Sequence, residues 1–293
     1  MRLVTLLEDG RTRSGLVVGD EVVDLTDPSV GLPGALVDVL VLGEDARPAL
    51  GSAARRGARR IPLADARLGA PVRRPPAFLG IARNYEDHIA ELGVERPTRQ
   101  TWFAKLSTCV VGPGDAIEVP YASVQVDYEG ELGVVIGRRC RHVPVDGALA
   151  VVAGYTVVND VSVRDWQRST PTMLLGKGFD THGPVGPWVV TADEIPDPQS
   201  LRVRTRVNGE VRQDGTTSDM IFTVAEMIAH LSTVATLEPQ TVLATGTPAG
   251  VGAASDPPRW LVAGDTVAVE VEGVGVLTNP VVDEPRPVDR SPG

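Results

Sequence analysis

The 293-residue chain has the composition of an ordinary globular protein, with 42% hydrophobic and 23% charged residues. Its formal net charge of -10 argues against nucleic acid and anionic membranes as partners, although a bound cation could still attract an anionic substrate. No apolar run approaches the roughly 18 residues of a membrane span, and the N-terminus has no signal-peptide pattern. The two cysteines, Cys109 and Cys140, are typical of free thiols in a reducing compartment, so we expect a cytoplasmic protein.

The first 70 residues predict a small α/β region. Alternating apolar residues between positions 1 and 25 indicate two short strands joined by a polar turn. The Ala- and Leu-rich stretch 34–58 indicates one or two helices. The segment 71–76 (PVRRPP) has the composition of a stiff connector, so we place the end of the N-terminal region, residues 1–70, directly before it.

From residue 71 to residue 282 the pattern is mostly that of β-strands. The candidate strands cover residues 77–82, 131–137, 150–159, 187–191, 201–207, 241–246 and 266–277. Asn208 and Gly209 predict a hairpin, since a type I′ turn needs a positive φ at both central residues. Residues 222–231 have helical spacing. Many short strands and few helices favour an α+β, mostly β fold with a rolled or closed mixed sheet, followed by a disordered tail at residues 283–293.

Three carboxylates predict a binding site for a hard divalent cation. Glu129 and Glu131 are two residues apart on a predicted strand, so both point to one face of the sheet. Asp160 ends the next apolar strand, where it can project into a cleft. Three carboxylates without a nearby His or Cys suit Mg²⁺, with Mn²⁺ or Ca²⁺ as alternatives. On the spacing alone, a solvent-exposed pair of glutamates on a sheet is the commoner arrangement.

A short predicted helix carries a histidine beside a glutamate. Asn84 is the candidate N-cap of this helix and Gly93 the candidate C-cap. His88 and Glu91 are three residues apart and share a face, and a carboxylate beside an imidazole fixes its tautomer and raises its basicity. The pair could activate a water as a general base, whereas the commoner alternative is a surface ion pair.

Lysine is almost absent from this chain. Of its 28 basic residues only Lys105 and Lys177 are lysines, so arginine stands wherever any cation suffices. A lysine that remains is a candidate for a position that needs a compact, titratable ammonium, although chance alone could also leave two.

Six ordered motifs resemble the fumarylacetoacetate hydrolase family. They are GIARNYEDHIAELG (80–93), DYEGELGVVIG (127–137), AGYTVVNDVSVRDWQ (153–167), GKGFDTHGPVGPW (176–188), VNGEVRQDG (207–215) and TGTPAGVG (245–252). The resemblance points to the acylpyruvase and 2-hydroxyhepta-2,4-diene-1,7-dioate isomerase branch. It implies a mixed β-roll catalytic domain at residues 71–282 and a homodimer. One departure is Gln240-Thr241, where many relatives have Gly-Asp.

The resemblance also implies site residues, each of which has a counterpart in this sequence. The matches are Glu129, Glu131 and Asp160 to the metal ligands, His88 and Glu91 to the catalytic pair, Lys177 to the active-site lysine, Arg164 and Gln167 to positions near metal and substrate, and Thr247 to a loop that in relatives helps hold a substrate carboxylate.

The expected substrate is a small 2-oxo acid, and the expected reaction cleaves a carbon–carbon bond of an acylpyruvate-like 2,4-dioxo acid. The metal would chelate the 1-carboxylate and the 2-oxo oxygen and stabilise an enolate, while His88, oriented by Glu91, activates the attacking water. Lys177 would neutralise the developing charge. A decarboxylase or a keto–enol isomerase acting on a related 2-oxo acid is the alternative, and a non-catalytic ligand-binding protein is a third hypothesis.

Overall fold

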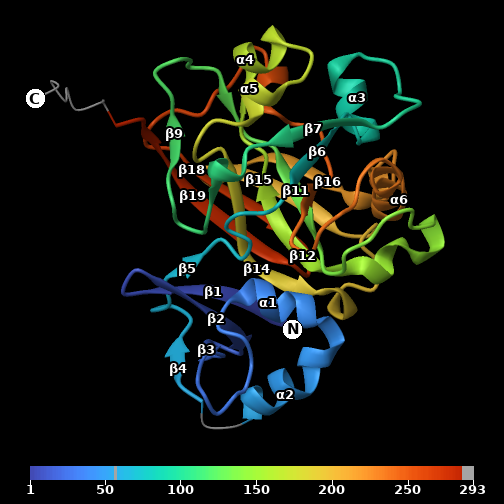
Figure 1. Ribbon diagram of the computed structural model, residues 1–293. Coiled ribbons are helices and arrows are strands. Elements are labelled where there is room, and N and C mark those ends of the chain that lie inside the picture. Colours follow the sequence, from blue (N-terminus) through green and yellow to red (C-terminus); the bar gives the residue numbers. More distant parts are fainter. Residues whose placement is uncertain (56–57, 286–293) are drawn as a thin grey trace, which may run out of the picture.

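The N-terminal region shares its sheet with the rest of the chain. The computed structural model describes residues 1–55 and 58–285. The elements of this region are β1 (Arg2–Glu8), β2 (Arg11–Val18), β3 (Glu21–Asp24), α1 (Leu36–Leu42), α2 (Arg47–Arg55), β4 (Arg60–Pro62) and β5 (Leu68–Gly69). β1 pairs with β2 and β5, and also with β14 (Gly183–Thr191) far along the chain (Figure 1). The boundary at residue 70 remains a prediction, since the hydrogen bonding of the sheet continues across it.

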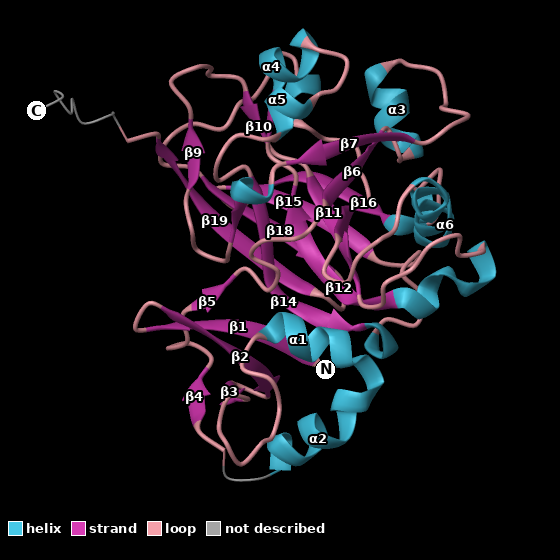
Figure 2. Cartoon of the chain, in the orientation of Figure 1, coloured by secondary structure: helices cyan, strands magenta, loops and turns pink. Residues whose placement is uncertain are grey.

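The remaining residues form the larger part of the molecule, which is mostly β. Its elements are β6 (Phe78–Ala82), α3 (Glu86–Leu92), β7 (Thr101–Lys105), β8 (Val110–Val111), β9 (Ile117–Val119), β10 (Val126–Asp127), β11 (Gly130–Ile136), β12 (Val152–Asn159), β13 (Ser162–Val163), α4 (Arg164–Ser169), α5 (Leu174–Lys177), β14, β15 (Arg202–Val207), β16 (Glu210–Thr216), α6 (Val224–Val234), β17 (Val242–Ala244), β18 (Thr266–Val271) and β19 (Gly275–Asp283). Strands dominate in Figure 2, which confirms the predicted α+β, mostly β class.

Two sheets pack against each other in the larger part. Within the described residues, one sheet has the strand order β4-β3-β2-β1-β14-β12-β11-β17-β6-β7, and the other the order β16-β15-β18-β19-β9. Most neighbouring strands are antiparallel, but β17 pairs with β6, and β19 with β9, in parallel. This mixed pairing, with both sheets contributing to one core, confirms the predicted mixed β-roll.

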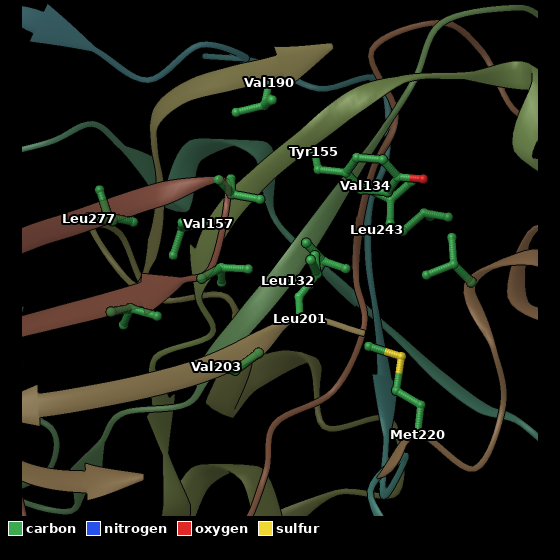
Figure 3. Packing of buried hydrophobic residues seen from close by; sticks show 14 of the residues in the cluster. Leu132, Val134, Tyr155, Val157, Val190, Leu201, Val203, Met220, Leu243 and Leu277 are labelled. Atoms are coloured by element: carbon green, nitrogen blue, oxygen red, sulfur yellow. The ribbon is translucent and has the colours of Figure 1, made fainter. Parts of the chain in front are cut away.

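The central strands β11 and β12 are buried on both faces. Leu132 and Val157 belong to the core between the two sheets, which also includes Leu277 of the smaller sheet (Figure 3). Val135 and Val158 belong to a second core, which includes residues of α1 and α2. Strands that are buried on both faces appear in a sequence as continuous apolar runs, as these two do. Charged residues at the end of such strands need a partner, because burying an unpaired charge is costly.

Two of the predicted elements are wrong in detail. The predicted strand 266–277 is a hairpin of β18 and β19, because the chain turns at Gly273, which has a φ of 72°. Residues 1–25 hold three strands rather than two, because Gly19, with a φ of 59°, turns the chain between β2 and β3. The hairpin at Asn208 and Gly209 is confirmed, with φ angles of 53° and 81°.

At the C-terminus, β19 extends to Asp283, which pairs with Val119 of β9. Most of the predicted disordered tail, residues 286–293, lies outside the described residues. In the part of the chain that the structure describes, no helix combines the length and the apolar character that a membrane span requires.

Candidate active site

The register of β11 against β12 brings the three predicted carboxylates together. Gly130 pairs with Asn159, and just beyond this pair the amide of Asp160 donates to the carbonyl oxygen of Glu129 at 2.8 Å. Glu131 lies two residues after Glu129 and therefore on the same face. One carboxylate oxygen from each of the three residues lies within 4.8 Å of the other two, and all three side chains are buried.

Glu131 is the member of this cluster that most needs a cation. Its carboxylate accepts a hydrogen bond from the amide of Gly246 at 2.8 Å, and no ion pair among the described residues includes it. Burial and the negative charges of Asp160 and Glu129 raise the pKa of Glu131 well above its usual range. Such a group takes up either a proton or a cation. Three carboxylates that converge in this way fit a hard divalent ion, which prefers oxygen ligands.

Both lysines of the chain are buried at this cluster. Lys177, at the end of α5, donates to Glu129 at 2.7 Å and to Asp160 at 2.6 Å. Lys105, at the end of β7, lies 2.7 Å from the other oxygen of Asp160 and donates to the carbonyl of Lys177 at 2.5 Å. Burial opposes the charge of Lys177, but Asp160 and Glu129 raise its pKa above its ordinary value. The two ammonium groups therefore each contact one carboxylate oxygen of Asp160.

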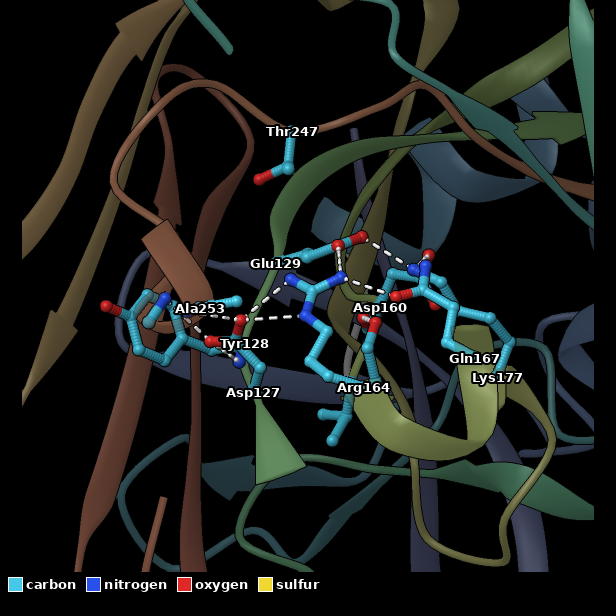
Figure 4. Close-up of polar contacts among 12 residues, drawn as sticks. Asp127, Tyr128, Glu129, Asp160, Arg164, Gln167, Lys177, Thr247 and Ala253 are labelled. Atoms are coloured by element: carbon cyan, nitrogen blue, oxygen red, sulfur yellow. Dashed lines mark hydrogen bonds and ion pairs between the residues drawn. The ribbon is translucent and has the colours of Figure 1, made fainter. Parts of the chain in front are cut away.

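Arg164, the first residue of α4, joins Glu129 to Asp127 (Figure 4). Its Nε donates to Asp127 at 2.8 Å and its terminal nitrogen donates to Glu129 at 2.6 Å. Asp127 also accepts hydrogen bonds from the amides of residues 252 and 253. Although burial opposes its ionisation, Lys177 and Arg164 hold the pKa of Glu129 below its usual range. Arg164 thus fixes the position of a predicted metal ligand and keeps it ionised.

The buried charges at this end of the sheet do not balance. The cluster contains four buried carboxylates and three buried basic side chains. The carboxylates are those of Asp127, Glu129, Glu131 and Asp160, and the basic side chains are those of Lys105, Arg164 and Lys177. With all of them ionised, the cluster carries one net negative charge. A divalent cation would make it positive by one charge, and that field suits an anionic substrate.

The helix α3 places His88 beside the same cluster. Its Nδ1 lies 3.2 Å from one carboxylate oxygen of Glu91, and the other oxygen of Glu91 accepts from the amide of Gly250 at 2.8 Å. A carboxylate next to Nδ1 favours the tautomer in which that nitrogen carries the proton, and in that tautomer the lone pair of Nε2 can accept a proton. The predicted pair is therefore formed, and the loop that follows β17 holds its glutamate in place.

The end of α3 agrees with the prediction and its beginning does not. Gly93 ends the helix with a φ of 63°. The predicted N-cap Asn84 is wrong, because Tyr85 occupies that position. The buried side chain of Asn84 instead donates to the carbonyls of Phe222 and Thr245 and accepts from the amide of Phe222. These bonds tie the start of the helix to two distant segments.

Gln167 and Thr247 differ in how their polar atoms are used. The side-chain oxygen of Gln167 accepts from Arg164 at 3.0 Å. The hydroxyl of Thr247 donates to the carbonyl of Gly130 at 2.9 Å and accepts from Gln213 at 2.7 Å. Figure 4 shows Thr247 apart from the Glu129 and Arg164 network. Its hydroxyl could hold a substrate carboxylate only after giving up the bond to Gly130.

A cavity of about 640 Å³ opens over this cluster, large enough for a small organic acid with room to spare. Seven of the nine predicted site residues line it, namely His88, Glu129, Glu131, Arg164, Gln167, Lys177 and Thr247. Asp160 and Glu91 lie behind that lining, in contact with Lys177 and His88. The structure therefore gathers all nine around one cavity.

Residues 77–282 match the family model described as Fumarylacetoacetate (FAA) hydrolase C-terminal. The chain belongs to the fumarylacetoacetate hydrolase family. It is 42% identical over 266 residues to the mitochondrial oxaloacetate tautomerase Fahd2a of Rattus norvegicus, which covers 90% of this chain and 85% of that protein. The maleylpyruvate hydrolase from Sphingobium sp. SYK-6, solved with manganese(II) and pyruvate, has a TM-score of 0.83 at 33% identity, over 97% of this chain and 100% of that one.

A third similar protein is the 2-hydroxyhepta-2,4-diene-1,7-dioate isomerase from Mycobacterium marinum, with a TM-score of 0.76 at 35% identity, over 98% of this chain and 100% of that one. These likenesses confirm the predicted family and its acylpyruvase and isomerase branch. The protein is therefore an enzyme of this family, and the proteins similar to it include a hydrolase, an isomerase and a tautomerase.

Three buried residues of the cluster are absent from the predicted set. Asp127 continues the spacing of two that marks Glu129, so the same pattern could have revealed it. The scarcity of lysine points to Lys105 as much as to Lys177, but the predicted site includes only Lys177. Gln213, which bonds to Thr247 and to the amide of residue 130, has no local signal, because its partners are distant in the sequence.

Proposed function

We propose that this enzyme is a divalent-metal-dependent hydrolase that cleaves the carbon–carbon bond of an acylpyruvate-like 2,4-dioxo acid, with Mg²⁺ as the cofactor and Mn²⁺ or Ca²⁺ as alternatives. The observation that carries the proposal is the carboxylate cluster of Glu129, Glu131 and Asp160, within 4.8 Å, in a cavity that also exposes His88. The manganese and pyruvate in the similar maleylpyruvate hydrolase support both the kind of cofactor and the kind of substrate.

Glu129, Glu131 and Asp160 would hold the cation. When bound, the cation would supply Lewis-acid polarisation of the 2-oxo group of the substrate. Lys177 lies on the cavity wall beside these groups, so its ammonium disperses the negative charge that develops as the bond breaks. Arg164 keeps Glu129 ionised and in position.

The His88 and Glu91 pair supplies the base for hydrolysis. Nε2 of His88 takes a proton from a water molecule, and the water oxygen bonds to C4 of the substrate. The C3–C4 bond breaks, its electron pair moves to C3, and the proton returns from His88 to C3. The products are pyruvate and a carboxylic acid, so atoms and electrons balance without a further reactant. Glu91 holds the ring in one tautomer, and Gln167 on the same wall orients the water.

A tautomerase or isomerase is the second candidate, favoured by the 42% identity to the rat oxaloacetate tautomerase. The same Nε2 of His88 would then move a proton between C3 and a carbonyl oxygen, and no carbon–carbon bond would break. A decarboxylase has less use for a base, so the fixed pair of His88 and Glu91 argues for the other two activities.

Turnover of a 2,4-dioxo acid in ¹⁸O-labelled water with Mg²⁺ distinguishes these activities. Hydrolysis releases pyruvate and places one ¹⁸O in the carboxylic acid product. A tautomerase leaves the carbon skeleton intact and changes the ultraviolet absorbance of the enol form. If neither change exceeds the uncatalysed rate over a panel of 2-oxo acids, the proposal is wrong. The homodimer implied by the family remains a prediction, which light scattering tests.

A further inference from the structure

We infer that a second cavity, whose walls include residues of β1, β2 and the connector 71–76, binds a phosphate monoester. This cavity has a volume of about 420 Å³. Among the described residues, none lines both it and the active-site cavity. Its ligand would therefore be an effector or an additional ligand and not the substrate, so the inference does not depend on the proposed function.

Two arginines of this cavity carry charges that no carboxylate offsets. Arg73 and Arg74 line the cavity and are exposed, and neither forms an ion pair within residues 1–55 and 58–285. The third arginine of the wall belongs to a separate group of two basic and two acidic side chains whose charges cancel. This group consists of Arg13, Arg59, Glu8 and Asp24.

The wall of the cavity is free of negative charge in the part of the chain that the structure describes, because no Asp or Glu is among the described residues that line it. The chain as a whole has a net charge of -10, so such a wall is not expected from the composition. Two guanidinium groups without carboxylate partners suit an anion from solution, and their planar donors match the oxygens of a phosphate group.

A buried hydroxyl group faces the same cavity. Thr5, on β1, lines the cavity and is only 5% exposed, yet its hydroxyl has no hydrogen-bond partner among the residues described. A buried polar group without a partner costs free energy, and an oxygen of a bound anion would accept its hydrogen bond. Thr12, Ser107 and Thr108 add further hydroxyls to this wall. Hydroxyl groups together with arginines are typical contacts of a phosphate group.

The backbone holds these donors in place. Arg73 and Arg74 lie between Pro71 and Pro75, which are both buried, so the backbone that carries the two guanidinium groups is stiff. Less entropy is then lost when the side chains order around a ligand.

Gln240 also lines the cavity and has a φ of 72°, in the left-handed region that favours glycine. Its side-chain amide can donate to an anion. A side chain with a hydrogen-bond donor at a strained position on a cavity wall is typical of a functional residue.

The apolar part of the wall indicates an organic phosphate rather than the free ion. Ala35, Leu36 and Val37 line the same cavity, and its volume exceeds what a phosphate ion alone would fill. The phosphate group would contact the arginines and the hydroxyls, and the organic group of the ester would cover the apolar residues.

Calorimetric titration of the Mg²⁺-loaded protein with phenyl phosphate tests the inference. The wild type should bind one molecule per chain with a Kd of about 1 mM or lower, and should bind inorganic phosphate more weakly because that ion lacks the apolar contact. Arg73→Gln and Arg74→Gln should each weaken binding about tenfold or more, as expected when a charge-assisted hydrogen bond is lost. Arg141→Gln, which changes an exposed arginine that does not line this cavity, is the matched control and should leave the Kd unchanged.

Thr5→Val separates ligand binding from folding, because valine has a similar branched shape and the hydroxyl that it removes bonds to no described residue. It should weaken binding of phenyl phosphate roughly threefold while it keeps the melting temperature of the wild type or exceeds it. A Kd above about 10 mM in the wild type, or an unchanged Kd in both arginine variants, would overturn the inference. Competition by pyruvate would also overturn it, since phenyl phosphate would then bind at the active site. Equal affinities for phenyl phosphate and inorganic phosphate would uphold the anion site and reject the ester as its ligand.

Discussion

Replacing Lys105 with methionine should destabilise the protein more without Mg²⁺ than with it. The side chain of Lys105 is 0% exposed, and its ammonium lies 2.7 Å from Asp160. It also donates to the carbonyls of Lys177 at 2.5 Å and Val161 at 3.3 Å. Methionine keeps most of the apolar stem, so the change mainly removes the charge.

The expected loss of stability depends on the ion pair that Asp160 keeps after Lys105 is replaced. Removing one partner of a buried ion pair costs about 3–5 kcal/mol when the other charge is left alone. Asp160 keeps Lys177 at 2.6 Å, so we expect the lower end, about 3 kcal/mol. For a chain of this length, that loss lowers the melting temperature by roughly 5 °C. A divalent cation held by the carboxylates replaces the lost charge and should at least halve the difference.

Thermal unfolding followed by circular dichroism, with millimolar Mg²⁺ or with chelator, measures both quantities. Arg139→Met is the control, because its pair with Glu238 is 69% and 47% exposed and contributes about 0.5 kcal/mol at most. A loss below about 1 kcal/mol with chelator would refute the reasoning. So would a loss that is equal with and without Mg²⁺, since Lys105 and the cation would then not neutralise the same carboxylate.

Four further tests address other parts of the account. Asp160→Asn should weaken Mg²⁺ binding at least about tenfold by calorimetry, and wild-type affinity would remove it from the ligands. His88→Ala and Glu91→Ala should each lower kcat about 10²–10⁴-fold, and the double variant should be little worse than the worse single one; losses that multiply would contradict a joint role. Burial lowers the pKa of His182 to about 4. As the pH falls below about 6.5, this histidine takes up a proton in the unfolded chain before it does so in the folded one, so its effect should lower the free energy of unfolding of the wild type by about 3 kcal/mol at pH 4. His182→Gln should lack that loss when the free energy of unfolding in urea is measured against pH. Parallel curves for the variant and the wild type would contradict this assignment to His182. Gln240 has a φ of 72°, a conformation that glycine adopts without strain, so Gln240→Gly should raise the free energy of unfolding by up to about 1 kcal/mol and with it the urea midpoint. A lower midpoint would show that the side chain of Gln240 stabilises the fold by more than its backbone strain costs.

The parts of the site that the sequence predicts are those set by local geometry. Glu129, directly before β11, and Glu131, within it, are two residues apart, and His88 and Glu91 are three apart on α3. These spacings place side chains together in any fold that forms the strand and the helix. That Asp160 meets these two glutamates follows from the pairing of β11 with β12, which apolar runs alone do not specify.

The predictions fail where distant residues decide the structure. Asn84 has the local context of a helix cap, but its amide is used in bonds to residues 138 and 161 positions away. Gln213 is buried between the backbone of Gly130 and the hydroxyl of Thr247, and nothing near it in the sequence indicates that position. The turn at residues 272–274 escapes detection because the apolar alternation continues from β18 into β19.

The central claim is that the three buried carboxylates hold the divalent cation on which turnover depends. The most direct test strips the protein with chelator, titrates Mg²⁺ back and follows calorimetric binding and pyruvate release from a 2,4-dioxo acid in parallel, in the wild type and in Glu131→Gln. We predict one cation per chain in the wild type, turnover that saturates at the same Mg²⁺ concentration as binding, and the loss of both in the variant. Pyruvate release by the metal-free wild type at the full rate, or wild-type binding by Glu131→Gln, would contradict the claim.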